Sequence, residues 1–141
     1  MKNLTSTCQF RSVLLALAFV FAGQLAYTQV YISTNKTEFC TYNERTEKFD
    51  NCKDWEENTM FEVNAEETMF THTTNDISSA YYVKDKSEED GMILWTVVSD
   101  VGNKYVYVFD FENEMVSVVG NSDDAGQFMK TYFIKRAWTD D

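Results

Sequence analysis

The chain has 141 residues, of which 23 are acidic and 12 are basic, so its formal net charge at pH 7 is −11. A surface this negative repels phosphate backbones, and we expect no nucleic-acid partner. The sequence also lacks a dinucleotide fingerprint, a phosphate-binding loop and a metalloprotease helix, so we expect no cofactor and no catalytic residues.

The first 28 residues have the pattern of a secretory signal peptide. Lys2 and Arg11 precede an unbroken apolar run, Val13–Ala22, and Gly23 follows it. This run is about half the length of roughly 20 residues that a helix needs to span a bilayer. We therefore predict a cleaved leader over residues 1–28 and no membrane insertion.

Cleavage after Thr28 leaves residues 29–141 as a single β domain in a secreted or periplasmic protein. Cleavage after Ala26 is the alternative. The leader holds two of the 12 basic residues and none of the 23 acidic ones, so its removal changes the net charge from −11 to −13. A domain of this length can bury one hydrophobic core but not two.

Beyond the leader, short runs rich in Val, Ile, Thr, Tyr and Phe alternate with clusters of Asn, Asp, Gly and Glu. This pattern predicts antiparallel strands. In the first region, Thr37–Tyr42 and Glu47–Cys52 can pair around a turn at Asn43–Arg45. Because export leads to an oxidising compartment, we predict a disulfide between Cys40 and Cys52. A loop of about 13 residues closed in this way contributes on the order of 3 kcal/mol.

The next predicted hairpin, Thr59–Val63 with Thr68–Thr74, contains the sole histidine, His72. A zinc site needs about four nitrogen or sulfur ligands, which one histidine and two cysteines cannot supply, so we expect no metal site. A catalytic triad would need Ser and Asp partners that the sequence does not place. Since His72 follows Phe70 on one strand face, we interpret it as a structural histidine.

Residues 78–119 predict a meander, in which strands that are neighbours in sequence pair in the sheet. Its four strands are Ser78–Lys84, Met92–Ser99, Lys104–Phe111 and Met115–Val119. We expect the charged segment Asp85–Gly91 to form a long hairpin loop. Neither this segment nor the acidic segment 121–126 has the ligand spacing of an EF-hand, so we interpret both as solvated loops.

The last alternating stretch, Met129–Trp138, predicts a strand, although Asp123 and Asp124 ahead of it would also suit the start of a helix. The count reaches about eight to ten short strands in a chain without proline. We predict an all-β antiparallel meander closed into a small up-and-down barrel, with a two-sheet sandwich as the alternative. Closure is favoured because it removes edge strands.

Aromatic residues are dense, with 11 Phe, 8 Tyr and 3 Trp. We select Trp95, Tyr81, Tyr105 and Tyr107 as candidate ligand-binding residues. They could line a cavity for an apolar ligand or form an exposed platform for a sugar or a protein. The simpler interpretation is a core of large side chains with ordinary cross-strand aromatic pairs.

The function that these observations favour is an exported, non-enzymatic β module. It would bind a macromolecular partner, either a protein or a glycan, or serve structurally at the cell exterior. The alternative is a barrel that carries a small apolar ligand. A third hypothesis is a small hydrolase built from scattered carboxylates, which lacks the positioned acid and base that such chemistry needs.

Overall fold

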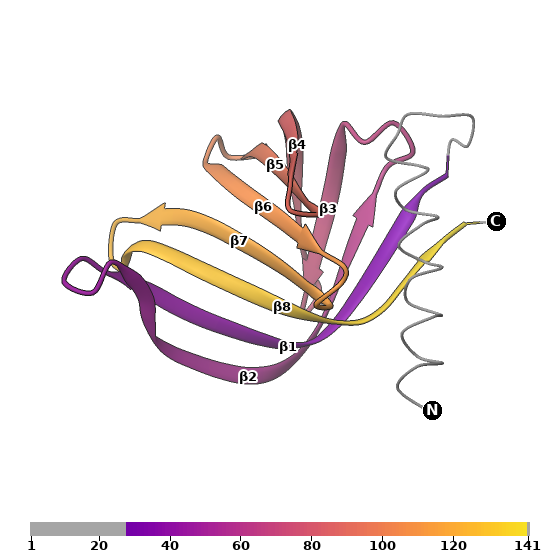
Figure 1. Cartoon of the computed structure of the whole chain (residues 1–141). Helices are drawn as coiled ribbons and strands as arrows, with labels where there is room; N and C mark the ends of the chain where they lie inside the picture. The colour runs from indigo at the N-terminus through magenta and orange to yellow at the C-terminus, as the bar shows by residue number, and fades with distance from the viewer. Residues whose placement is uncertain (1–27, 141) are drawn as a thin grey trace.

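The computed structural model describes residues 28–140, which form one closed barrel of eight antiparallel strands (Figure 1). The strands are β1 Val30–Asn43, β2 Lys48–Val63, β3 Met69–Thr74, β4 Ile77–Glu89, β5 Met92–Ser99, β6 Lys104–Asp110, β7 Met115–Ser122 and β8 Gly126–Thr139. Each strand pairs with the next, and β8 pairs with β1 to close the wall. The predicted up-and-down barrel is confirmed, and the sandwich alternative is wrong.

The predicted leader lies outside the described residues, apart from Thr28. Within residues 28–140, no helix has the length and apolar character that crossing a bilayer would require.

Because the strands run alternately up and down, the turns gather at two ends of the barrel. We call the end with the β2–β3, β4–β5 and β6–β7 turns the lower end, and the opposite end the upper end. These two names do not follow the orientation of Figure 1. Asn75–Asp76 and Asp90–Gly91 are two-residue turns in which every residue has a positive φ. This is the backbone conformation of type I′ hairpin turns, which match the twist of antiparallel strands.

β4 is longer than the sequence predicted. Ser87 pairs with Leu94 and Glu88 pairs with Ile93, so the prediction of a long loop over Asp85–Gly91 is wrong. The charges in this segment mark a strand whose side chains are exposed, and only its last two residues form the turn.

The acidic segment near the C-terminal strand is also shorter as a loop than predicted. β7 continues to Ser122 and β8 begins at Gly126, so only residues 123–125 form the turn. The alternative of a helix start at Asp123 and Asp124 is wrong, and the predicted C-terminal strand is confirmed.

The β1–β2 hairpin projects beyond the rest of the barrel at the upper end (Figure 1). Its predicted pairing is present, with Asn43 opposite Lys48. β2 pairs with β3 only over Thr59–Val63, so within the described chain the segment Lys48–Asn58 has a free second edge. Six charged side chains along this edge oppose pairing with a further strand.

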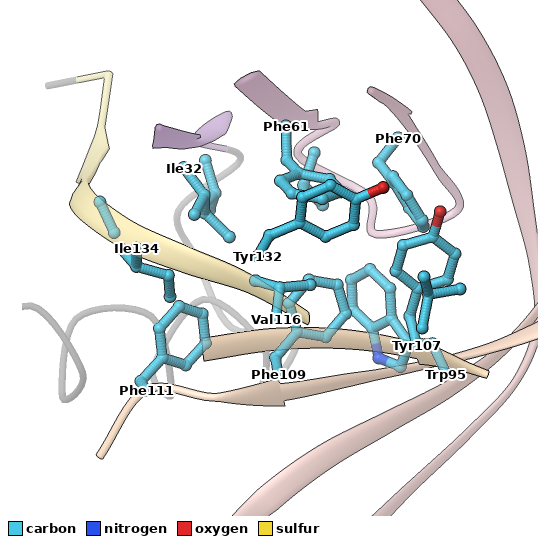
Figure 2. Packing of buried hydrophobic residues seen from close by; sticks show 14 of the residues in the cluster. Ile32, Phe61, Phe70, Trp95, Tyr107, Phe109, Phe111, Val116, Tyr132 and Ile134 are labelled. Atoms are coloured by element: carbon cyan, nitrogen blue, oxygen red, sulfur yellow. The ribbon is translucent and has the colours of Figure 1, made fainter. Parts of the chain in front are cut away.

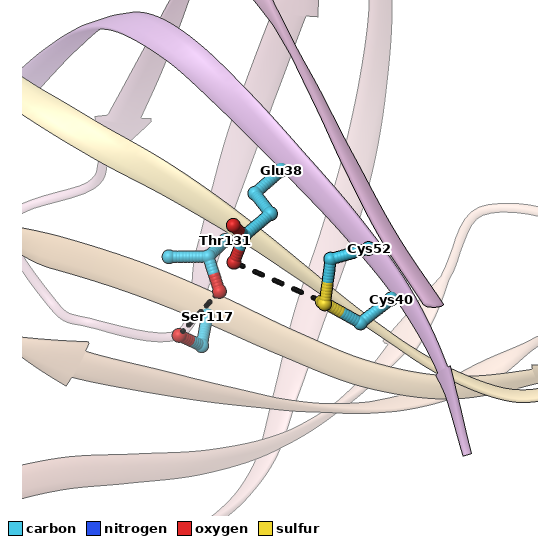
Figure 3. The surroundings of a disulfide bond; sticks show 5 residues. All are labelled: Glu38, Cys40, Cys52, Ser117 and Thr131. Atoms are coloured by element: carbon cyan, nitrogen blue, oxygen red, sulfur yellow. Dashed lines mark hydrogen bonds between the residues drawn. A yellow bond between two sulfur atoms is a disulfide. The ribbon is translucent and has the colours of Figure 1, made fainter. Parts of the chain in front are cut away.

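The predicted disulfide is present. Cys40 of β1 and Cys52 of β2 are joined, with their Cα atoms 4.1 Å apart (Figure 3). Cys40 is buried and Cys52 is exposed, and the Glu38 carboxylate lies beside them, with Oε1 3.8 Å from Cys40 Sγ. Because β2 has no second neighbour here, the bond ties its free half to β1.

The hydrophobic core fills the inner side of the wall (Figure 2). The largest fully buried side chains are those of Trp95, Phe61, Phe70, Phe109 and Phe111. Phe70 lies at the centre, with its ring centroid 4.8 Å from Tyr107, 5.2 Å from Tyr81 and 6.2 Å from Trp95. Such aromatic pairs add about 0.5–1.5 kcal/mol each beyond the area that they bury.

The lower end carries a buried carboxylate. Glu67, in the β2–β3 turn, has a positive φ of 57° and pairs with Lys86 Nζ at 3.2 Å. The same ammonium lies 5.4 Å from the centre of the Trp95 ring. Burial raises the pKa of Glu67, and the ion pair with Lys86 opposes that rise only in part. The Glu67–Lys86 pair therefore lies against the buried Trp95 ring.

Candidate functional site

Three of the four candidate aromatic residues lie together. The Tyr81 ring centroid is 5.4 Å from that of Tyr107 and 6.0 Å from that of Tyr105. Tyr107 is buried, whereas Tyr81 and Tyr105 are half-buried toward the upper end. Trp95 lies directly opposite Tyr107 in the β5–β6 ladder, and its ring packs against Phe109 with centroids 5.0 Å apart.

His72 lies on the inner face of β3, beside this cluster. Its ring stacks on Phe61 with centroids 4.0 Å apart, and its Nε2 is 2.9 Å from Thr59 Oγ1. Thr59 is in turn 2.6 Å from Thr34 Oγ1. Burial, with a smaller effect of the Lys130 charge, lowers the pKa of His72 to about 3. The imidazole is therefore neutral at pH 7.

The buried tyrosines also stay in one protonation state. Burial raises the pKa of Tyr107 well above its ordinary value, and the neighbouring hydroxyls of Tyr81 and Tyr132 raise it further. Burial likewise raises the pKa of Tyr132. A phenol that stays protonated can donate a hydrogen bond but does not serve as a base at pH 7.

A second feature is a groove of about 630 Å³ on the outer surface of the barrel, over strands β8, β1, β2 and β3. We call it the outer groove. It is lined by Ser33, Thr34, Asn58, Thr59, Met60, Thr73, Asn75, Asp76, Lys135, Arg136 and Trp138. Most of these side chains carry hydroxyl, amide or charged groups.

The strand register explains how the outer groove forms. Ser33 of β1 lies opposite Arg136 of β8 and Met60 of β2, and Met60 lies opposite Thr73 of β3. Residues that are directly opposite share one face of a sheet, so these four side chains form a row across four strands. The β1–β8 ladder shifts register on both sides of Thr34, the β1–β2 ladder shifts between Thr34 and Lys36, and the groove lies beside these irregularities.

Arg136 is held in place by an aromatic stack at one end of the groove. Its guanidinium carbon lies 4.5 Å from the centre of the Trp138 ring. The Trp138 ring stacks on Tyr31 with centroids 5.4 Å apart and planes 14° apart, and the Tyr31 hydroxyl donates a hydrogen bond to Asp140. A cation over an indole face is attracted by the ring electrons.

The disulfide region was a further candidate, because Glu38, Cys40 and Cys52 bring a carboxylate and two sulfurs within 4.8 Å of one another. Metal ions bind the thiolate form of cysteine. Since both sulfurs are joined in the disulfide, this cluster has no thiolate to offer.

No family model, curated protein or solved structure matches this chain. The function must therefore be inferred from the geometry of the chain itself. Sequence reasoning missed the outer groove, since Lys135 and Arg136 are adjacent and an ideal strand would point them to opposite faces. In the sequence, the feature that could have indicated this groove is that Lys135 and Arg136 stand two to three residues before Trp138.

Proposed function

We propose that this protein is a non-enzymatic binding module that recognises a saccharide in the outer groove. The observation that carries the proposal is the row of outward side chains, Arg136, Ser33, Met60 and Thr73, beside an opening of about 630 Å³. A saccharide presents hydroxyl groups in several directions. The groove offers matching partners, because amide and hydroxyl side chains both donate and accept hydrogen bonds.

An extracellular setting is part of this proposal. A disulfide persists in an oxidising environment and is rare in the cytosol. The predicted leader would deliver the chain to such a compartment. A net charge far from zero favours solubility there.

The interior of the barrel supports the proposal indirectly. The core rings are in contact with one another from Phe61 through Phe70 and Tyr107 to Phe109. Eight-stranded barrels are narrow, and their interior is either filled by side chains or holds one small ligand. In our proposal, these packed rings form a rigid support and the ligand binds on the outer face.

The proposal is tested by titrating a panel of oligosaccharides against the purified protein by calorimetry. Replacing Thr73 by Ala removes one hydroxyl from the groove, and we expect affinity for a bound saccharide to fall by about twofold to tenfold, as for one hydrogen bond. Thr96→Ala is the matched control, because Thr96 is exposed on β5, outside the groove. Binding that is lost equally in both variants would contradict the assignment of the site.

A second candidate function is a carrier of a small apolar ligand at the upper end. It is favoured by half-buried rings there, with Phe128 5.5 Å from Phe39 and 6.5 Å from Tyr105. An apolar fluorescent dye that binds wild type, and binds Tyr105→Ala more weakly, would support it. Binding that is unchanged by this substitution would count against it.

The hydrolase hypothesis is tested with ester, peptide and glycoside substrates. Turnover that disappears in His72→Ala would overturn the proposal of a non-enzymatic module. We expect no turnover, because a histidine whose pKa is lowered to about 3 is a weak base and its Nε2 is engaged with Thr59.

A further inference from the structure

Two neighbouring cations, Lys135 and Arg136, line the outer groove. Arg136 lies opposite Ser33, and the next pair in the ladder is Ile134 with Thr34, so Lys135 is the extra residue of a bulge. A bulge turns side chains that would otherwise alternate. Both residues are exposed, and both line the same groove.

Neither cation has an ion-pair partner among the described residues. This differs from Lys36, which pairs with Asp54 at 3.0 Å, and from Lys86, which pairs with Glu67. The groove lining contains a single acid, Asp76. The lining therefore carries a net positive charge, although the whole chain has a net charge of −11.

The guanidinium of Arg136 is also preorganised. Contact with the Trp138 ring, which stacks on Tyr31, restricts the positions that the Arg136 side chain can take. A planar guanidinium presents paired N–H donors that match the two oxygens of a carboxylate. Less side-chain freedom is then lost when a ligand binds.

We infer that the outer groove selects a saccharide that carries a carboxylate, such as a uronic acid. This inference rests on the proposed function and adds the ligand class. The carboxylate binds Arg136, with Lys135 beside it, while Asn58, Thr73 and Asn75 bind the sugar hydroxyls.

The experiment compares three probes by calorimetry: an oligogalacturonate, a neutral galactose oligomer of the same length, and acetate alone. We expect the oligogalacturonate to bind about tenfold more tightly than the neutral oligomer, as for one charge-assisted bidentate contact. We expect acetate alone to bind too weakly to measure. Raising NaCl from about 50 to 200 mM should reduce the difference between the oligomers, since both cations are exposed.

The variant Arg136→Gln should remove the preference for the charged oligomer, so that both oligomers bind this variant with similar affinity. Arg136→Lys keeps the charge but not the planar donors, so it should restore the preference only in part. Lys104→Gln is the matched control, because Lys104 is an exposed cation outside the groove. Circular dichroism and the melting temperature establish that each variant is folded.

The outcomes separate the two levels of the proposal. Equal affinity for both oligomers, unaffected by Arg136→Gln, would overturn carboxylate selection and leave saccharide binding standing. Binding of acetate as tight as that of the oligogalacturonate would overturn the assignment of a saccharide ligand. Binding of neither oligomer, with other saccharides also inactive, would overturn the proposed function itself.

Discussion

The two faces of the wall formed by β8, β1, β2 and β3 carry different kinds of polar group, although they are built from adjacent residues. On the inner face, Thr34, Thr59 and His72 contact one another at 2.6 and 2.9 Å and are buried. On the outer face, one residue away from two of them, Ser33 and Met60 line an open groove. The inner groups are buried and bond to one another. The outer hydroxyls of Ser33 and Thr73 bond to the Arg136 carbonyl and to Ser78 and remain partly exposed beside the groove.

This contrast indicates a division of labour. The interior provides stability through packed rings and satisfied hydroxyls. The outer face is in contact with solvent, so Lys135 and Arg136 can remain there without ion-pair partners among the described residues. On a buried face, an unpaired charge would be strongly destabilising. Substitutions on the inner face should therefore change stability, and substitutions in the groove should change binding.

The largest expected effect is on the inner face, at Phe70. This residue is fully buried and contacts Tyr81, Trp95 and Tyr107. We expect Phe70→Ala to reduce the free energy of unfolding by about 3–5 kcal/mol, measured by chemical denaturation. Thr73→Ala on the outer face should change it by no more than about 0.5 kcal/mol. A small effect at Phe70 would mean that the core is not packed as described.

The disulfide should have the next largest effect. Replacing both Cys40 and Cys52 by Ser should lower the free energy of unfolding by about 3 kcal/mol, because the unfolded chain is no longer cross-linked. The free half of β2 should then exchange its amide protons faster than β5, since only β1 holds it. Intact mass under non-reducing conditions gives the control. Two free thiols in the wild type would contradict the bond.

A smaller loss of stability is expected for a substitution at Gly120, which lies at the upper rim of the interior. A Cβ atom at this position would lie 2.6 Å from Tyr105 Cδ1 and 3.0 Å from Phe128 Cζ. We expect Gly120→Ala to destabilise the protein by about 1–3 kcal/mol through overpacking. Truncating Tyr105 to Ala in the same chain should remove most of that penalty, and a purely additive double variant would argue against the contact.

The pH dependence that His72 introduces is absent at neutral pH and appears only in acid. Its pKa is about 3 in the folded protein, below the ordinary 6.5, so the unfolded chain binds more protons between these values. Stability is fully present above pH 6.5 and is lost as the pH falls toward 3, by at most about 1.4 kcal/mol per pH unit. His72→Gln should flatten this part of the curve. An unchanged slope would show that other groups cause it.

Much of the fold could be predicted from the sequence, because strand alternation and turn residues are local signals. The meander from residue 78 to 119 followed from such signals. Barrel closure was expected because it removes edge strands, and the Cys40–Cys52 bond because the predicted leader directs the chain to an oxidising compartment. The prediction failed at Asp85–Gly91, since a run of charges indicates exposure and does not distinguish a loop from an exposed strand. The sequence predicts no strand over residues 53–58, yet these residues belong to the continuous strand β2, which joins the two predicted strands Glu47–Cys52 and Thr59–Val63.

The candidate site was harder to predict than the fold. Tyr81, Tyr105 and Tyr107 lie together, because alternate residues of a strand share a face and paired strands bring faces together. Ligand binding by these residues and Trp95 stays a prediction. The outer groove depends on bulges around Thr34, and a single sequence contains no signal for where a ladder shifts its register. The relation between Lys135, Arg136 and Ser33 exists only in the closed barrel.

The most direct test of the central claim is to map ligand contacts by NMR, with amide chemical shifts recorded during titration with an oligogalacturonate. We expect shifts to concentrate at Ser33, Asn58, Thr73 and Arg136, which line the outer groove. Shifts concentrated instead at Tyr81, Tyr105 and Tyr107 would place the ligand inside the barrel and contradict the account.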